Sequence, residues 1–174
     1  MPLMDLTYPA GALSADTLDE LSEELTTVLL RAERAPDTDF FRTITWLHVH
    51  ELPSSAVRAA GRPVPEPVFR LDVTVPGGAL SDRRKQELVA EATRVISAAA
   101  GLGEADAMRI WVLIREVPDG NWGAAGQVIR FEQLRRMAAS ERDSAQPVPA
   151  QPAPALAAPA APAAASERDR APVA

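Results

Sequence analysis

The sequence predicts an α+β fold in which tandem β-α-β units form one four-stranded sheet with two helices on one face. Two internal matches carry this prediction. DLTYPAGALS, at residues 5–14, recurs 67 residues later as DVTVPGGALS, at 72–81. ITWLHVHELP, at 44–53, recurs 65 residues later as RIWVLIREVP, at 109–118. Matches in the same order on two separate segments indicate two copies of one supersecondary unit.

Each copy reads, in order, as strand, turn, helix, loop and strand. Alternating apolar runs at Leu3–Tyr8 and Val68–Val75, each ended by a proline, predict the first strands. Ser14 and Ser81 are typical N-caps, because a serine hydroxyl can accept a hydrogen bond from a backbone N–H of the first turn. Gly101 is expected to end the second helix. Apolar residues three and four positions apart predict one buried stripe per helix: Leu18, Leu21, Leu25, Val28 and Leu29 in the first, and Leu88, Ala92, Val95, Ile96 and Ala99 in the second.

The second strands, expected at Thr43–Leu52 and Met108–Val117, are rich in β-branched and aromatic residues. The short crossover from strand through helix to strand implies that the two strands of each copy run parallel and are joined right-handedly. Helices then cover one face of the sheet, while apolar side chains such as Trp46 and Trp111 also occupy the other. We therefore expect the chain to associate with itself.

Composition narrows the class of protein. The chain has 174 residues, no cysteine, two histidines and a net charge of −6. The absence of cysteine excludes disulfides and fits a reducing cytoplasm. The acidic balance argues against nucleic acid as the main partner, and no apolar run has the roughly 20 residues of a membrane span. His48 and His50 have no evident third ligand, so we expect structural roles for them, no metal site and no cofactor.

We divide the chain into a first unit at 2–63, a second unit with a C-terminal hairpin at 64–137, and a disordered tail at 138–174. The tail is dominated by alanine and proline. Such a segment buries too little apolar surface to offset the entropy lost on ordering.

Pro2 follows the initiator Met1 directly. Methionine before a small residue is normally removed, which would leave the proline nitrogen as a free secondary amine. A free α-amino group titrates at about 7.7–8.0. An apolar pocket or a nearby cation would lower that pKa further and suit the amine to act as a general base near neutral pH.

Three features together resemble the tautomerase superfamily: Pro2, the β-α-β repeat and the segment EVPDGNWGAAGQ at 116–127. The closest group is the 4-oxalocrotonate tautomerase family in its fused form, with two subunits in one chain. The resemblance covers residues 2 to about 131. It implies a tautomerase/MIF-like fold, a proline in an apolar pocket flanked by arginines, and a homotrimer.

The function that this resemblance implies is a cofactor-independent tautomerase acting on small 2-oxo acids or dienols, with Pro2 as general base. The alternatives are a dehalogenase, hydratase or decarboxylase of the same superfamily, or a catalytically silent trimeric scaffold. Leu113 stands where a tyrosine would be expected in a cis-3-chloroacrylate dehalogenase, which weakens that alternative. Pro2 aligns with Phe69 in the second copy, so one chain offers one proline-based site.

The arginine that should anchor a substrate carboxylate is less obvious. The family's turn arginine is missing, because the corresponding positions hold Ala12 or Leu13, and Ala79 or Leu80. The family's second-strand arginine is replaced by Trp46 and Trp111.

Side chains alternate between faces along a strand, so Arg109 would share the face of Trp111. Arg109 is therefore our first candidate anchor and Arg42 the second. Trp122 and Trp111 are expected to line the pocket. Glu51 and Glu116 recur after the second strands, which suggests a shared structural hydrogen bond.

Overall fold

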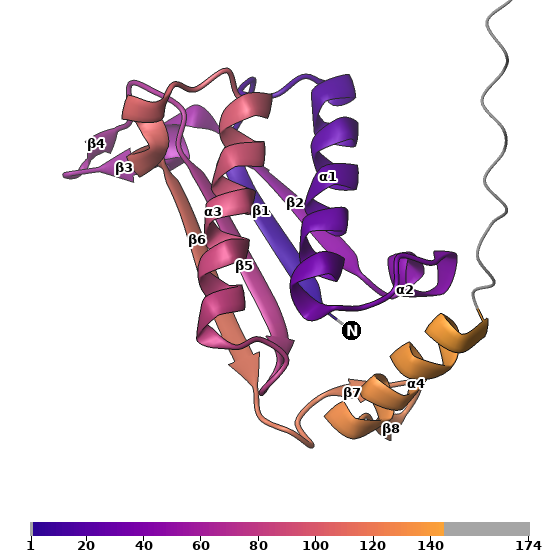
Figure 1. Cartoon of the computed structure of the whole chain (residues 1–174). Coiled ribbons are helices and arrows are strands. Elements are labelled where there is room, and N and C mark those ends of the chain that lie inside the picture. The colour runs from indigo at the N-terminus through magenta and orange to yellow at the C-terminus, as the bar shows by residue number, and fades with distance from the viewer. Residues whose placement is uncertain (1, 145–174) are drawn as a thin grey trace, which may run out of the picture.

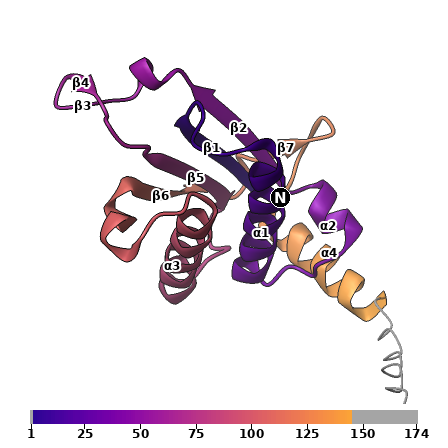
Figure 2. The same ribbon diagram turned by 90° about the horizontal axis from the view of Figure 1, so that it is seen from above.

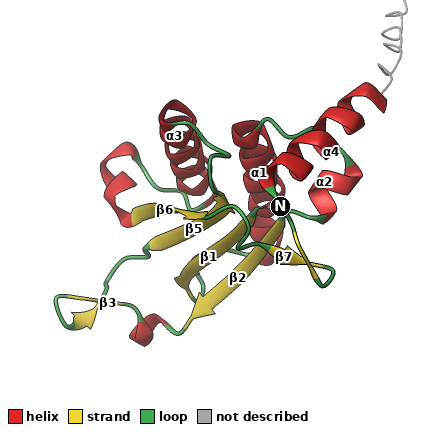
Figure 3. Cartoon of the chain, turned by 90° about the horizontal axis from the view of Figure 1, so that it is seen from below, coloured by secondary structure: helices red, strands yellow, loops and turns green. Residues whose placement is uncertain are grey.

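The computed structural model describes residues 2–144. Its centre is a four-stranded sheet in the order β2-β1-β5-β6. The two strands of each unit pair in parallel, and β1 pairs with β5 in antiparallel fashion at the middle of the sheet. The strand bounds are β1 (Leu3–Pro9), β2 (Trp46–Leu52), β5 (Phe69–Pro76) and β6 (Ile110–Val117). The long helices α1 (Ala15–Glu33) and α3 (Asp82–Ala99) both cover one face of the sheet (Figures 2 and 3). The expected fold class is confirmed.

The strand register shows that the two units are structurally equivalent. Leu3 pairs with Trp46 in the first unit, and Arg70 pairs with Trp111 in the second. Leu3 therefore corresponds to Arg70, and the residue before it, Pro2, corresponds to Phe69. This is the alignment that the sequence repeat predicts.

Both long helices begin where the sequence predicts. The Ser14 hydroxyl accepts a hydrogen bond from the Thr17 backbone N–H at 3.1 Å, and the Ser81 hydroxyl accepts one from the Arg84 N–H at 3.4 Å. Gly101, with φ +64°, follows the end of α3. The helices bury their apolar stripes against the sheet; fully buried residues of this core include Leu6, Leu21, Leu25, Leu29, Leu71, Val73, Ala92 and Ile96.

The second strands begin later than expected, at Trp46 and Ile110. In the first unit, the Thr38 hydroxyl accepts from the Phe41 N–H and starts the short helix α2 (Asp39–Thr43). In the second unit, residues Glu104–Arg109 form the 3₁₀ helix η2. The expected strand position of Arg109 was therefore wrong, because it ends a short helix before the strand. Arg42, expected next to the start of a strand, lies instead in α2.

The helix α4 (Phe131–Ser144) also departs from expectation, because it runs through residues 138–144 of the predicted tail. Ala138 is buried against Leu30 and Phe41. The first proline of the tail is Pro147, so nothing in the preceding alanine-containing segment breaks the helix. In Figure 1, α4 lies below the ends of α1 and α2. Residues 145–174 lie outside the described part of the chain.

Three small elements complete the fold. The 3₁₀ helix η1 (Ser54–Ala56) precedes a hairpin of β3 (Arg58–Ala59) and β4 (Arg62–Pro63). A second hairpin, β7 (Gly123–Ala124) with β8 (Gln127–Val128), links β6 to α4. None of the helices between residues 2 and 144 is both long enough and apolar enough to cross a membrane.

The face of the sheet opposite the helices is open in a single copy of the chain. Trp46 and Trp111 are 61% and 64% exposed there, and Leu113, two residues after Trp111 on β6, is 38% exposed. As predicted, apolar side chains occupy this face and no helix of the described chain covers them.

Candidate active site

Pro2 lies at the start of β1, beside the end of β5. Its side chain is buried, and its carbonyl oxygen accepts a hydrogen bond from the Trp46 backbone N–H at 3.3 Å. The next residue, Leu3, pairs with Thr74 of β5. Two residues farther along β5, Pro76 lines a cavity of about 590 Å³ between the end of α1, the turn after β5, and α4. In Figure 1, the amino terminus lies at this end of the molecule.

The cavity wall is strongly basic. It carries five arginines, Arg34, Arg84, Arg135, Arg136 and Arg142, against the two glutamates Glu33 and Glu132. Glu132 pairs with Arg135 and Arg136, each at 3.3 Å. Among residues 2–144, the other three arginines have no carboxylate within ion-pair distance. This excess of positive charge suits a small anionic ligand.

Glu33, the last residue of α1, has an unusual acidity. Desolvation raises the pKa of its carboxyl from 4.5 to about 7, against the opposing effects of the charged amino terminus and Arg84. A carboxyl with this pKa exchanges its proton near neutral pH, as an acid-base group must.

Arg84 is held at the junction of the two units. Its Nη1 donates to the Ala32 carbonyl at the end of α1, at 3.1 Å, and its Nε donates to the Ser81 hydroxyl at 3.4 Å. Arg84 is not among the arginines expected from sequence, because it lies in the first turn of α3, just after the turn positions that correspond to the family's arginine. One signal was available: the first turn of a helix favours acidic residues, and a basic residue there is unusual.

The guanidinium of Arg42 makes its hydrogen bonds within the first unit. The group donates to Asp37 at 2.6 and 3.1 Å, to Glu23 at 2.7 Å and to Thr27 at 3.0 Å. The hydrogen bond to Asp37 is the main cause that raises the pKa of Arg42 above its usual value. With these donors occupied, Arg42 is bound within the protomer.

Arg109 and Trp111 lie toward the opposite end of the sheet from Pro2. Trp111 pairs with Arg70, whose partner in β1 is Thr7. Thr7 is four residues beyond Leu3, which is about 13 Å along a strand. Arg109 lies farther still and pairs with Glu66 at 3.2 Å and Asp106 at 3.0 Å. Within one protomer, neither side chain belongs to the cavity beside Pro2, so their predicted roles would require a second copy.

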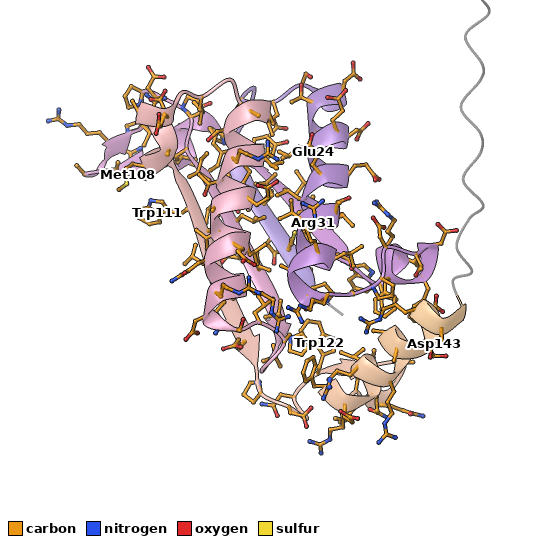
Figure 4. The ribbon with its side chains drawn as sticks, in the orientation of Figure 1. Glu24, Arg31, Met108, Trp111, Trp122 and Asp143 are labelled. Carbon is orange, nitrogen blue, oxygen red and sulfur yellow. The ribbon has the colours of Figure 1, made fainter. Side chains whose placement is uncertain are left out.

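Trp122 follows the other end of β6, in the segment that leads to α4. Val117, the last residue of β6, pairs with Pro76 on the cavity wall, and Trp122 follows five residues later. Its side chain is partly buried, and its carbonyl accepts from the Ile129 N–H at 2.8 Å. Figure 4 labels Trp122 and Trp111 at well-separated places in the molecule. The protomer therefore brings Trp122, but not Trp111, toward the Pro2 end of the sheet.

Glu51 and Glu116 serve the fold, as the repeat suggests. Glu51 Oε1 accepts from the Gly11 N–H at 3.1 Å, and Glu116 Oε1 accepts from the Gly78 N–H at 3.3 Å. Each glutamate thus ties the end of a second strand to the turn after a first strand.

Two fused β-α-β units, with Pro2 immediately before the first strand, are the arrangement that the resemblance to the tautomerase superfamily predicts. Residues 70–132 match the family model described as Tautomerase enzyme. Over that segment the chain matches the family, and the fold of the whole chain is similar to that of the fused 4-oxalocrotonate tautomerases. The recognition made from sequence is confirmed.

Solved structures agree on the fold. A fused 4-oxalocrotonate tautomerase described as an asymmetric trimer is 21% identical, with a TM-score of 0.61 over 72% of this chain and 94% of that chain. N1, a member of the cis-3-chloroacrylic acid dehalogenase family, is 19% identical, with a TM-score of 0.65 over 82% and 96%. The macrophage migration inhibitory factor of Toxoplasma gondii is 11% identical, with a TM-score of 0.58 over 73% and 99%. No curated protein compared with the chain matches it.

Proposed function

We propose that the protein is a cofactor-independent tautomerase that uses Pro2 as general base on small 2-oxo acids or dienols. The observation that carries the proposal is the position of Pro2, which is buried at the start of β1. The neighbouring strand β5 ends at Pro76, on the wall of a cavity of about 590 Å³ that carries five arginines. Removal of Met1 would free the proline nitrogen. Nearby cations disfavour the protonated amine and lower its pKa, so that the amine is available as a base near neutrality.

In the proposed reaction, an arginine of the cavity binds the substrate carboxylate through charge-assisted hydrogen bonds. Arg84 is the best placed by its two anchoring contacts. The Pro2 nitrogen removes a proton from the carbon next to the carbonyl, and the resulting enolate is stabilised by the same positive surroundings. The protonated proline then returns the proton to a different carbon, which completes the isomerisation without any cofactor.

The two units divide this work. Phe69 occupies the position equivalent to Pro2 and lies within the chain, so its nitrogen is an amide and has no basicity. The second unit instead contributes Pro76, Gly78, Ala79 and Arg84 to the cavity wall. This asymmetry supports one proline-based site per chain, with the base from the first unit and the anchor from the second.

Hydration or dehalogenation of an unsaturated acid is a second candidate, and Glu33 favours it. Such a reaction needs an acid-base group that activates water, and the pKa of Glu33 is about 7 on the wall of the cavity. The substitution Glu33→Gln distinguishes the two candidate functions. That substitution should abolish hydration of an unsaturated acid while leaving ketonisation by Pro2 largely intact.

We also propose that the chain forms a homotrimer through the open face of its sheet. Exposed Trp46 and Trp111 support association there, and similar solved structures are described as trimers. In such a trimer, Arg109 and Trp111 of one copy would complete the site around Pro2 of a neighbouring copy. That arrangement would reconcile the sequence-based roles of these two residues with their distance from Pro2 in a single chain.

Ketonisation of phenylenolpyruvate or 2-hydroxymuconate by the wild type and by Pro2→Ala tests the proposal. A general base typically contributes 100-fold or more, so kcat should fall by at least about 100-fold in the variant. Intact mass must first establish that Met1 is removed from both proteins. Equal rates would refute Pro2 as the base. If neither protein exceeds the rate of the uncatalysed reaction, a catalytically silent scaffold would be the better description.

A further inference from the structure

Three donor side chains meet on the open face of the sheet, from two neighbouring strands. His48 and His50 are two residues apart on β2, so both project from the same face. Asp5 of β1 is the register partner of His48. The sequence hid this third donor, because Asp5 precedes the histidines by more than 40 residues and only the pairing of β1 with β2 brings them together.

The donor atoms are close to the spacing that a metal ion requires. Asp5 Oδ1 lies 2.9 Å from His50 Nε2 and 3.3 Å from His48 Nδ1. One donor atom from each residue lies within 4.8 Å of the other two. Tetrahedral Zn²⁺ with ligands at 2.0–2.2 Å needs donor–donor separations of about 3.3 Å. Small rotations of the imidazoles would therefore give three ligands and an open fourth position.

The equivalent position of the second unit has an aspartate but no histidine. By the strand register, Asp5, His48 and His50 correspond to Asp72, Leu113 and Arg115. Asp72 is paired with Arg115 and with Arg70, each at 2.7 Å. A guanidinium neutralises a carboxylate permanently but does not bind a metal ion. The first unit keeps the same aspartate, and it has His48 in place of Leu113 and His50 in place of Arg115.

The neighbouring arginines do not occupy the carboxylate of Asp5. Arg70 and Arg115 face it from β5 and β6, and both guanidiniums are committed to Asp72. In the described chain, Asp5 contacts the two histidines and has no arginine or lysine within ion-pair distance. The histidine side chains are 51% and 49% exposed in a single copy. They lie on the face through which we propose that the chain forms a homotrimer, so the site would face neighbouring copies in that assembly.

We propose that Asp5, His48 and His50 bind a divalent transition-metal ion, with Zn²⁺ as the best match to two imidazoles and one carboxylate. Zn²⁺ accepts this ligand set with a water or another ligand in the fourth position. The ion would link β1 to the edge strand β2, at the opposite face of the sheet from the helices and apart from the basic cavity beside Pro2. None of the three ligands lines that cavity.

Titration of the full-length protein with Co²⁺ and Zn²⁺ tests the site. We expect one ion per chain, visible d–d absorption bands from bound Co²⁺, and loss of those bands when Zn²⁺ displaces it. His48→Gln and His50→Gln should each weaken Zn²⁺ binding by more than about 100-fold, the upper range for changes in residues that merely support a ligand. The chain has no cysteine and no other histidine, so lost binding can be assigned without ambiguity.

Arg83→Gln is the control, because Arg83 lies on α3, which covers the other face of the sheet. It should leave Zn²⁺ affinity unchanged, and so should Pro2→Ala. Circular dichroism and size-exclusion chromatography check that the histidine variants fold and assemble like the wild type. The proposal is overturned if the wild type binds no Zn²⁺ or Co²⁺, or if both glutamine variants bind Zn²⁺ as tightly as the wild type.

Discussion

Arg84 of the second unit donates a hydrogen bond of 3.1 Å to the carbonyl of Ala32 in the first unit. The guanidinium is thereby fixed at the junction of α1 and α3, on the wall of the cavity beside Pro2. An arginine fixed in advance loses little additional freedom when it binds an anion, which favours it as a substrate anchor.

Replacing Arg84 by glutamine should therefore raise KM for a carboxylate substrate more than tenfold. The loss of one charge-assisted contact is worth about 1.5–3 kcal/mol. The neighbouring Arg83 pairs with Glu87 at 3.0 Å and does not line this cavity, so Arg83→Gln is the control. Steady-state kinetics with 2-hydroxymuconate measures both. If the two variants share the wild-type KM, Arg84 does not anchor the substrate.

Arg42→Ala should act on stability rather than on catalysis. The substitution breaks contacts with Asp37, Glu23 and Thr27 that join α2 to α1. Because the pairs are partly exposed, we expect a loss of about 1 kcal/mol in the free energy of unfolding. Urea denaturation measures the loss, and kinetics should show an unchanged KM. A tenfold rise in KM without destabilisation would instead support Arg42 as the anchor.

Arg109→Ala distinguishes two roles of Arg109. The side chain either binds substrate in the site of a neighbouring copy or only forms ion pairs within its own chain. If Arg109 of one copy binds substrate near Pro2 of another, KM should rise more than tenfold at concentrations where the protein is fully assembled. If Arg109 only pairs with Glu66 and Asp106, KM should stay constant. Analytical ultracentrifugation of the same samples shows whether assembly was retained.

The raised pKa of Glu33 predicts that the stability of the protein depends on pH. Its pKa is about 7 in the folded protein and near 4.5 in the unfolded chain, so the folded state holds more protons between these values. The free energy of unfolding should consequently fall as the pH rises from about 4.5 to 7. Urea titrations across this range should show that Glu33→Gln removes that decline. An identical pH profile for the variant would contradict the raised pKa.

Truncation should distinguish α4 from the residues that follow it. Removing residues 145–174 should preserve fold and turnover, whereas ending the chain at Met137 removes Ala138 from its contacts with Leu30 and Phe41. Arg142 is lost from the cavity wall at the same time. We expect the shorter protein to have a lower melting temperature and a higher KM. Thermal denaturation and kinetics of both truncations test this, and equal behaviour would mean that α4 contributes nothing.

The repeat made most of the fold predictable from sequence, because the same pattern occurs twice and each copy constrains the other. The register that aligns Trp46 with Trp111 also aligns Pro2 with Phe69, as expected. The strand starts were less predictable, because an apolar run after Thr38 fits either a short helix or an early strand. Local hydrogen bonds to the Thr38 hydroxyl decide in favour of the helix.

The candidate site was harder to predict, because it depends on contacts between distant segments. The cavity around Arg84 exists only because α4 packs against the end of α1. Asp5 becomes a third donor beside His48 and His50 only through strand pairing. No local pattern in the sequence encodes either contact.

The aspartates Asp5 and Asp72 face each other across the centre of the sheet, one from each half of the chain. When two halves are encoded separately within one gene, a change in one is not imposed on its twin. One half can preserve architecture while the other acquires new chemistry. A duplicated and joined ancestor thus gains room to diverge that an assembly of identical small subunits lacks.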